Sequence, residues 1–221
     1  MIKAVIFDLD GTVSDTISTI AHFGNVALEH CGFLPIDENE YKYFAGDGKV
    51  KLLHRALAFY GADTEENFKK VEAKYDSEYE ADPIFETKPF DGLVEELQKL
   101  KSRGTKLAIL SNKPDNVTVM VARELFGDLF CIVHGKRENI ATKPDPEGTN
   151  ILMEELGVTK EECVFVGDTN VDIFTAKNAG MKSIGVLWGF RDKKELFDAG
   201  ADHIIEKTDQ IFETILKIES E

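Results

Sequence analysis

AVIFDLDGT, residues 4–12, is the stretch that decides the fold of this chain. Its first four residues form an uninterrupted apolar run, which predicts a buried strand. Asp8 and Asp10 follow where that strand ends, and residues two positions apart in an extended chain point to the same side. Two adjacent carboxylates repel each other unless a cation joins them, and oxygen ligands favour Mg²⁺. The stretch therefore predicts a strand that presents a magnesium site at its C-terminal end.

From Phe90 onward, helical and strand patterns alternate along the chain. Repeated alternation of this kind predicts a parallel sheet with helices on both faces. The expected strands after the first are residues 106–110, 131–133, 163–166, 183–186 and 203–205. The expected helices are residues 91–103, 114–126, 146–156, 170–179 and 209–218.

The stretch between the first strand and residue 86 has a different character, because it contains no convincing strand pattern. Helical patterns cover residues 17–30, 37–44 and 49–60, and Thr64 is an N-cap candidate for a fourth helix. We therefore expect residues 1–15 and 87–221 to form an α/β core. Residues 16–86 are expected to form an all-helical domain inserted after the first strand.

The composition narrows the classes of function. The net charge of −15 argues against nucleic acid as a partner, because phosphate backbones need a basic surface. A small anionic substrate would also be repelled, so its site must carry local positive charge. No apolar run is long enough to cross a bilayer and no leader pattern opens the chain, so we expect a cytoplasmic protein without a membrane partner. The widely spaced Cys31, Cys131 and Cys163 are expected to be buried, reduced thiols.

Polar residues follow three further strands at the point where each strand ends. Ser111, Asn112 and Lys113 follow the strand at 106–110, Lys143 follows a loop after 131–133, and residues 167–172 follow the strand at 163–166. The carboxyl ends of parallel strands share one edge of a sheet, so these sites can converge. Each has an ordinary alternative as a turn, a helix cap or a solvated charge. Their joint occurrence at strand ends favours a shared functional site.

In this order, the motifs resemble those of the haloacid-dehalogenase superfamily, in particular its phosphatases with a helical cap. The resemblance covers nearly the whole chain. Within the superfamily the chain is most similar to phosphoglycolate phosphatases, through residues 46–57, 185–191 and 199–202. It implies an α/β fold, a Rossmann-like parallel sheet with helices on both faces and an all-helical cap after the first strand.

The resemblance also implies roles for the acidic residues. Asp8 is implied to attack phosphorus and form an aspartyl-phosphate, which splits one hard step into two. Asp10 is implied to protonate the leaving oxygen and then to activate water. The Asp8 side chain, the Asp10 main-chain carbonyl and Asp168 are implied to hold Mg²⁺, and Asp172 to orient Lys143 or a metal-bound water.

Further residues are implied to meet the substrate. Ser111 is expected to donate a hydrogen bond to a phosphoryl oxygen beside Asn112, and Lys143 to neutralise charge shared with Asp8. Thr12 belongs to the expected substrate-binding set. In the cap, Gly46 and Lys49 bound a candidate substrate-facing loop. The charges at Lys49, Lys51, Arg55 and Arg191 stay open between substrate contacts and ordinary surface charges.

The expected function is a Mg²⁺-dependent phosphatase for small phosphate monoesters, with phosphoglycolate as the leading substrate and a small phosphorylated metabolite as the partner. A phosphomutase of the β-phosphoglucomutase kind would use the same residues, although such mutases more often carry Val at the position of Thr12. A pyrophosphatase or nucleotidase stays open. A dehalogenase needs no metal, so Asp10 and Asp168 would have no purpose in it. A non-catalytic phosphate-binding protein would not need Asp8, Asp10, Ser111, Lys143 and Asp168 together. Both a monomer and a homodimer are compatible with the sequence.

Overall fold

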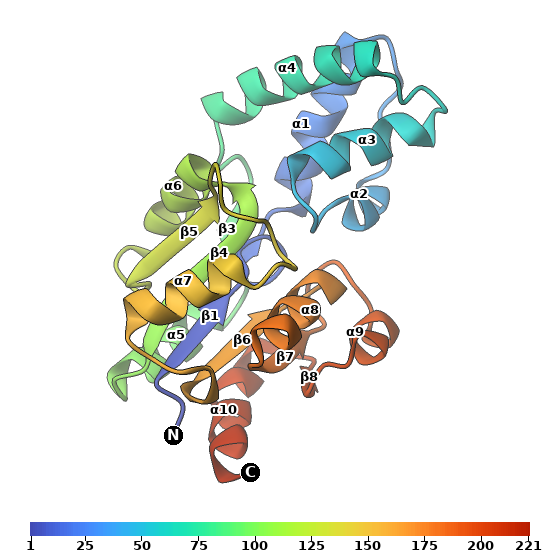
Figure 1. Cartoon of the computed structure of the whole chain (residues 1–221). Coiled ribbons are helices and arrows are strands. Elements are labelled where there is room, and N and C mark those ends of the chain that lie inside the picture. Colours follow the sequence, from blue (N-terminus) through green and yellow to red (C-terminus); the bar gives the residue numbers. More distant parts are fainter. The chain divides into compact units, whose positions relative to one another are not determined.

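The computed structural model describes all 221 residues and shows two compact units (Figure 1). The first unit combines Met1–Asp15 with Pro89–Glu221, and the second is Thr16–Lys88. The predicted α/β architecture with a helical insertion after the first strand is confirmed. That the two units serve as a catalytic core and a cap stays a prediction.

The first unit is built around a six-stranded parallel sheet, in which β1 lies between β4 and β6. The full strand order is β5-β4-β1-β6-β7-β8. The four residues of β1 are completely buried, as the apolar run predicts. The strands are β1 (Ala4–Phe7), β4 (Lys106–Pro114), β5 (Ile132–Lys136), β6 (Cys163–Gly167), β7 (Lys182–Val186) and β8 (His203–Ile205).

Helices cover both faces of this sheet (Figure 1). Alternate residues of β1 face opposite sides. Ala4 and Ile6 belong to a buried cluster with Leu152 of α7 and Ala176 of α8, whereas the Phe7 ring packs against Phe130 at 6.0 Å between centroids. The helices are α5 (Leu93–Ser102), α6 (Asp115–Phe126), α7 (Glu147–Leu156), α8 (Asn170–Ala179), α9 (Lys193–Ala199) and α10 (Ile211–Ser220), with short 3₁₀ turns at Lys160–Glu162 and Thr208–Gln210.

The structure corrects the sequence predictions at several places. Strand β4 continues beyond residue 110 to Pro114, because it keeps pairing with β5 after a register shift. Helix α9 is not among the helices predicted from the apolar pattern. All three cysteines are free as expected, but only Cys163 is buried. Cys131 is exposed because it precedes β5, which lies at the edge of the sheet.

The second unit consists of four helices, as the sequence predicts. Aromatic side chains pack inside it, with the Phe23 ring 5.1 Å from Tyr79 and 5.7 Å from Phe85. Thr64 caps the last helix by accepting a hydrogen bond from the N–H of Asn67. The helices are α1 (Ile17–His30), α2 (Glu38–Phe44), α3 (Lys49–Phe59) and α4 (Glu65–Ala81). A two-stranded sheet of β2 (Ser14–Asp15) and β3 (Lys88–Pro89) forms where the chain passes between the units.

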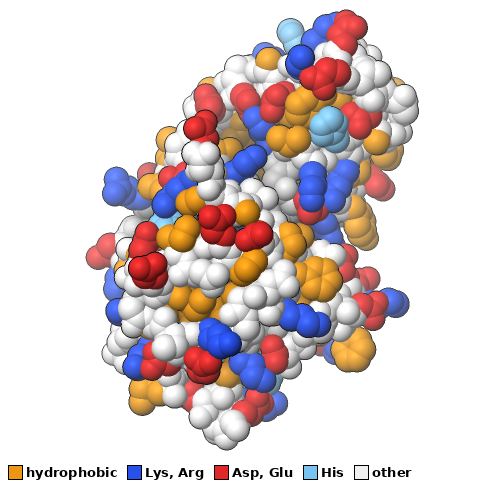
Figure 2. Space-filling model, in the orientation of Figure 1, with side chains coloured by type: hydrophobic (Ala, Val, Ile, Leu, Met, Phe, Trp, Pro, Cys, Tyr) orange, Lys and Arg blue, Asp and Glu red, His pale blue; other side chains and the backbone are white.

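The surface shows no concentration of one charge on the face drawn in Figure 2, where acidic and basic side chains are interspersed. None of the helices combines the length and the apolar character that crossing a lipid bilayer requires.

Candidate active site

The chain turns sharply after β1 and places two carboxylates at the C-terminal edge of the sheet. The Leu9 carbonyl accepts hydrogen bonds from the backbone N–H groups of Thr12, Val13 and Ser14, which closes the turn. Gly11 has a φ of 80°, a left-handed conformation that favours glycine. Asp8 is 5% exposed within this turn, whereas the side chain of Asp10 is 18% exposed.

Lys143 lies between two acids in the buried part of the site. Its ammonium group is 2.8 Å from Asp8 Oδ1 and 2.7 Å from Asp172 Oδ1. Burial alone lowers the pKa of Lys143, but Asp172 and Asp8 together raise it above its ordinary value. The other Asp172 oxygen accepts hydrogen bonds from the N–H and hydroxyl of Thr169, which fixes the carboxylate at the start of α8. The Lys143 ammonium group therefore contacts both Asp8 and Asp172, and the catalytic roles that the resemblance implies for these residues stay predictions.

Asp168 follows β6 and is completely buried. The Thr12 hydroxyl donates to its Oδ1 at 2.9 Å, and the backbone N–H of Phe190 donates to its Oδ2 at 2.8 Å. Thr12 is itself fully buried and uses its hydroxyl on this carboxylate. The part played by Phe190 has no signal in the sequence, because any residue could supply the N–H group.

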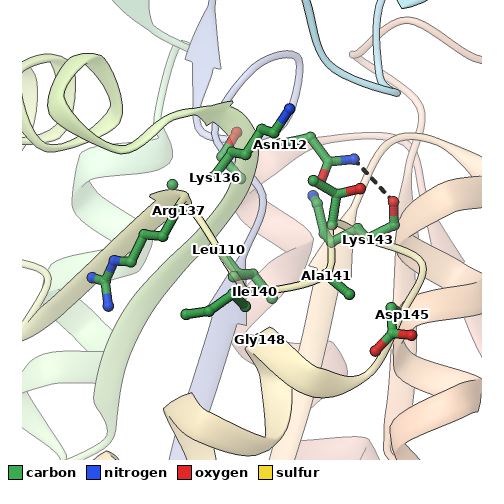
Figure 3. Close-up of a pocket in the computed structure, with 12 residues that line it drawn as sticks. Leu110, Asn112, Lys136, Arg137, Ile140, Ala141, Lys143, Asp145 and Gly148 are labelled. Atoms are coloured by element: carbon green, nitrogen blue, oxygen red, sulfur yellow. Dashed lines mark hydrogen bonds between the residues drawn. The ribbon is translucent and has the colours of Figure 1, made fainter.

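Ser111 and Asn112 lie near the end of β4, where they line a small pocket together with Lys143. The Ser111 hydroxyl accepts a hydrogen bond from the backbone N–H of Lys113 at 3.3 Å. The Asn112 amide donates to the Lys143 carbonyl at 3.1 Å, the dashed contact in Figure 3. In the same view the Arg137 guanidinium points away from this contact, and it pairs with Asp115 at 2.9 Å. Asn112 therefore fixes the loop that carries Lys143.

Lys113 is a site residue to which the sequence analysis assigns no role. Its ammonium group lies 2.9 Å from Asp10 Oδ1 and 3.2 Å from Oδ2, and the residue is only 8% exposed. The available signal was its position at a strand end beside Ser111. The contact holds the Asp10 carboxylate by both oxygens.

The donor set fits a divalent cation. Single ligand atoms of Asp8, Asp168 and Asp172 lie within 4.8 Å of one another. With Asp10, these acids make four carboxylates against the two ammonium groups of Lys113 and Lys143, so the cluster lacks two positive charges. A divalent cation such as Mg²⁺ would supply that charge, and carboxylate oxygens are its usual ligands. Asp172 also contacts Lys143 and Thr169, and the assignment of Asp8 and Asp168 as side-chain ligands stays a prediction.

The raised pKa values of Asp8 and Asp168 are what a cation site without its cation would show. Burial raises the pKa of Asp8 to about 7, although Lys143 lowers it. Burial also raises the pKa of Asp168 well above its ordinary value, and the neighbouring Asp172 and Asp8 raise it further. A bound dication favours the charged carboxylates and so opposes these shifts.

The predicted cap residues Gly46 and Lys49 belong to the second unit. Gly46 and Gly48 have φ values of 108° and 90°, so the loop before α3 uses conformations that favour glycine. The Lys49 ammonium group is held by Asp76 at 2.7 Å and Glu72 at 3.1 Å.

Two of the basic residues whose role the sequence leaves open make contacts within the same loop. Arg55 donates to the Phe44 carbonyl at 2.8 Å and pairs with Asp47, and Lys51 also pairs with Asp47. Arg191 belongs to the first unit, where it pairs with Glu195 and its side chain is 8% exposed. Substrate contacts by Gly46 and Lys49 stay predictions.

Comparisons with known proteins find relatives of this chain by sequence and by fold. A family model described as haloacid dehalogenase-like hydrolase matches residues 5–186. A phosphoglycolate phosphatase of Neisseria meningitidis is 32% identical over 221 residues, covering 97% of this chain and 94% of that protein.

Two solved structures extend the comparison. One from Lactobacillus delbrueckii subsp. bulgaricus, provisionally named a phosphoglycolate phosphatase, has a TM-score of 0.93 at 33% identity and covers 96% of this chain and 98% of its own. Another from Thermotoga maritima, provisionally named a β-phosphoglucomutase, has a TM-score of 0.73 at 27% identity and covers 98% of this chain and 99% of its own.

Proposed function

The chain belongs to the haloacid dehalogenase-like hydrolases, and we propose that it is a Mg²⁺-dependent phosphatase that hydrolyses small phosphate monoesters through an aspartyl-phosphate. One observation carries the proposal. The Asp8 carboxylate lies at the end of β1, 2.8 Å from the Lys143 ammonium group and within the carboxylate cluster that includes Asp168. This proximity supports the proposal, because the proposed nucleophile, a fixed positive charge and the proposed cation site would share one small space.

The contacts of Asp8 suit a nucleophile. The Leu9 N–H and the Lys143 ammonium group both bind Oδ1, at 2.7 and 2.8 Å. Oδ2 is thereby left for bond formation with phosphorus. Lys143 remains beside the reacting group and offsets negative charge that the phosphoryl oxygens share with Asp8. Asp172 holds Lys143 from the other side, so the ammonium group does not have to reorganise during the reaction.

Asp10 and Ser111 complete the chemistry. Asp10 is the more exposed acid, and it is proposed to give a proton to the leaving oxygen and then to take one from the attacking water. Ser111 is proposed to bind a phosphoryl oxygen. A Mg²⁺ ion held by Asp8, the Asp10 carbonyl and Asp168 would screen the repulsion between the Asp8 carboxylate and the phosphate.

Phosphoglycolate is the proposed substrate, because the Neisseria meningitidis relative is named for that activity. A phosphomutase is the second candidate, because the Thermotoga maritima structure shares the fold over nearly the full chain. Thr12 favours the phosphatase over the phosphomutase, because such mutases more often carry Val at this position. The proposed partner is a small phosphorylated metabolite, and a cytoplasmic location stays a prediction from the sequence.

The test is release of inorganic phosphate from a panel of small esters, with Mg²⁺ and with EDTA. The panel contains phosphoglycolate, sugar phosphates, nucleoside monophosphates and pyrophosphate. The proposal expects Mg²⁺-dependent release that is fastest with phosphoglycolate. Conversion of one sugar phosphate into its isomer with little free phosphate would favour the mutase, and release that persists in EDTA would contradict the metal requirement.

A further inference from the structure

Asp168 is held on both of its oxygens by residues from distant parts of the chain. Thr12, in the turn after β1, binds Oδ1, and the Phe190 N–H, in the loop after β7, binds Oδ2. Each oxygen of an ionised carboxylate can accept about two contacts, so each keeps acceptor capacity for a cation. The two hydrogen bonds therefore orient the carboxylate without using it up.

Two glycines close the space around this carboxylate. A Cβ placed at Gly11 would lie 2.4 Å from Asp168 Oδ2, and a Cβ at Gly189 would lie 2.4 Å from the same oxygen. The Gly189 position would also be 2.4 Å from the Gly11 carbonyl oxygen, so the two backbone segments approach each other directly. Asp168 therefore sits in a slot whose walls have no room for side chains.

Trp188 ties the two walls of the slot together. Its indole N–H donates to the Thr12 carbonyl at 3.0 Å, and its ring lies 6.4 Å from that of Phe90. Thr12 therefore contacts the loop after β7 through its carbonyl and Asp168 through its hydroxyl. We call Thr12 and residues 188–190 the Asp168 clamp.

We propose that the Asp168 clamp is a positioning element that fixes the Asp168 carboxylate for Mg²⁺ binding. Fixed orientation lowers the ordering cost that a free carboxylate pays when it binds an ion, and residues that orient metal ligands typically contribute strongly to affinity. Thr12 then acts through Asp168 and does not touch the substrate. The inference rests on the Mg²⁺ site of the proposed function, but not on ester hydrolysis.

Isothermal titration calorimetry with Mg²⁺ on the metal-free protein provides the test. Thr12→Val removes the hydroxyl at nearly constant shape, and we expect Kd to rise about 10-fold or more. Thr12→Ser keeps the hydroxyl and should stay within about threefold of wild type. The matched control is Thr175→Val, because Thr175 is equally buried but donates only to the Val171 carbonyl inside α8. Its Kd should equal that of wild type.

Two further variants test the other wall. Gly189→Ala should weaken Mg²⁺ binding at least as much as Thr12→Val, because the new methyl group displaces Asp168. Trp188→Phe removes the indole donor but keeps a ring beside Phe90, and a smaller rise in Kd is expected. Circular dichroism establishes that each variant is folded. If Thr12→Val does not fold, the comparison of Trp188→Phe with wild type decides.

Wild-type Kd values in folded Thr12→Val and Gly189→Ala would overturn the clamp, as would a wild-type protein that binds no Mg²⁺. A different outcome separates the clamp from the proposed function. If the protein binds Mg²⁺ but releases phosphate from no ester, the proposed phosphatase activity is wrong. If the clamp variants then lose Mg²⁺ binding, the clamp is still supported. Rescue by Thr12→Ser separates loss of the hydroxyl from a general structural defect.

Discussion

At the residue scale, the site depends on two buried ammonium groups that each make two contacts with carboxylate oxygens. Lys143 contacts Asp8 and Asp172, and Lys113 contacts both oxygens of Asp10. The types of these residues and their strand-end positions were visible in the sequence. Their pairing was not, because a contact between residues far apart in the chain is fixed by the sheet order.

Asp8→Asn should reduce phosphate release by at least about 10³-fold, since the amide is a poor nucleophile. The fold should survive, because the amide has the shape of the carboxylate and Lys143 keeps its contact with Asp172. Initial rates with saturating Mg²⁺ and a thermal melt provide the measurement. A folded variant with near wild-type turnover would exclude Asp8 as the nucleophile.

Lys113→Met should lower kcat/KM more for phosphoglycolate than for p-nitrophenyl phosphate. The p-nitrophenolate anion leaves without a proton, so it depends less on the position of Asp10 as the acid. A loss of about 10- to 100-fold is expected for the alkyl ester, within the range that general acid catalysis contributes. Lys113→Arg keeps the charge and should recover part of the rate.

Lys217→Met is the matched control for loss of a positive charge. Lys217 is exposed on α10, and its replacement should leave both rates unchanged. Equal losses for the two esters in Lys113→Met would show that Lys113 acts on something other than Asp10.

At the element scale, the apolar patterns predicted the parallel sheet, and they placed α1 and α8 at their observed bounds. They placed Ser111 just after a strand that in fact continues to Pro114, because pairing with β5 extends it. Helix α9 was missed, and its length alone does not explain this, because α2 is equally short and was predicted. The Phe190 contact was beyond prediction because it is made by a backbone group.

Helix α7 directly follows the loop that carries Lys143, and the packing of this helix can be tested. Leu152 of α7 is fully buried in the hydrophobic cluster between the sheet and helices α7 and α8. Leu152→Ala should lower the free energy of unfolding by about 2–5 kcal/mol, through lost burial and the cavity that remains. Urea denaturation measures the change. Leu216→Ala, at a residue that is 37% exposed on α10, should cost less than about 1 kcal/mol, and equal costs would contradict the assigned core.

At the scale of the whole molecule, a chain with a net charge of −15 concentrates buried acids at one edge of its sheet. The raised pKa values of Asp8 and Asp168 mean that the folded, metal-free protein binds protons that the unfolded chain releases above about pH 4. Its free energy of unfolding should therefore fall as pH rises from about 4 toward 7, the direction expected when folded pKa values lie above unfolded ones.

Mg²⁺ should consequently stabilise the protein more at about pH 8 than at about pH 5.5, because protons compete with the ion for the carboxylates. At 100 times its Kd, the ion should add about 2.7 kcal/mol to the free energy of unfolding. Thermal melts with Mg²⁺ and with EDTA at both pH values measure the gain. A gain independent of pH, or one retained in Asp168→Asn, would argue against this site.

The proposed mechanism requires that Asp8 itself carries the phosphoryl group during turnover. Rapid acid quenching of the enzyme with Mg²⁺ and phosphoglycolate, followed by borohydride reduction and peptide mapping, converts an aspartyl-phosphate into homoserine. We expect homoserine at position 8 in the wild type, and none in EDTA or in Asp8→Asn. Phosphate release accompanied by homoserine at another acid, or by no homoserine at all, would contradict it.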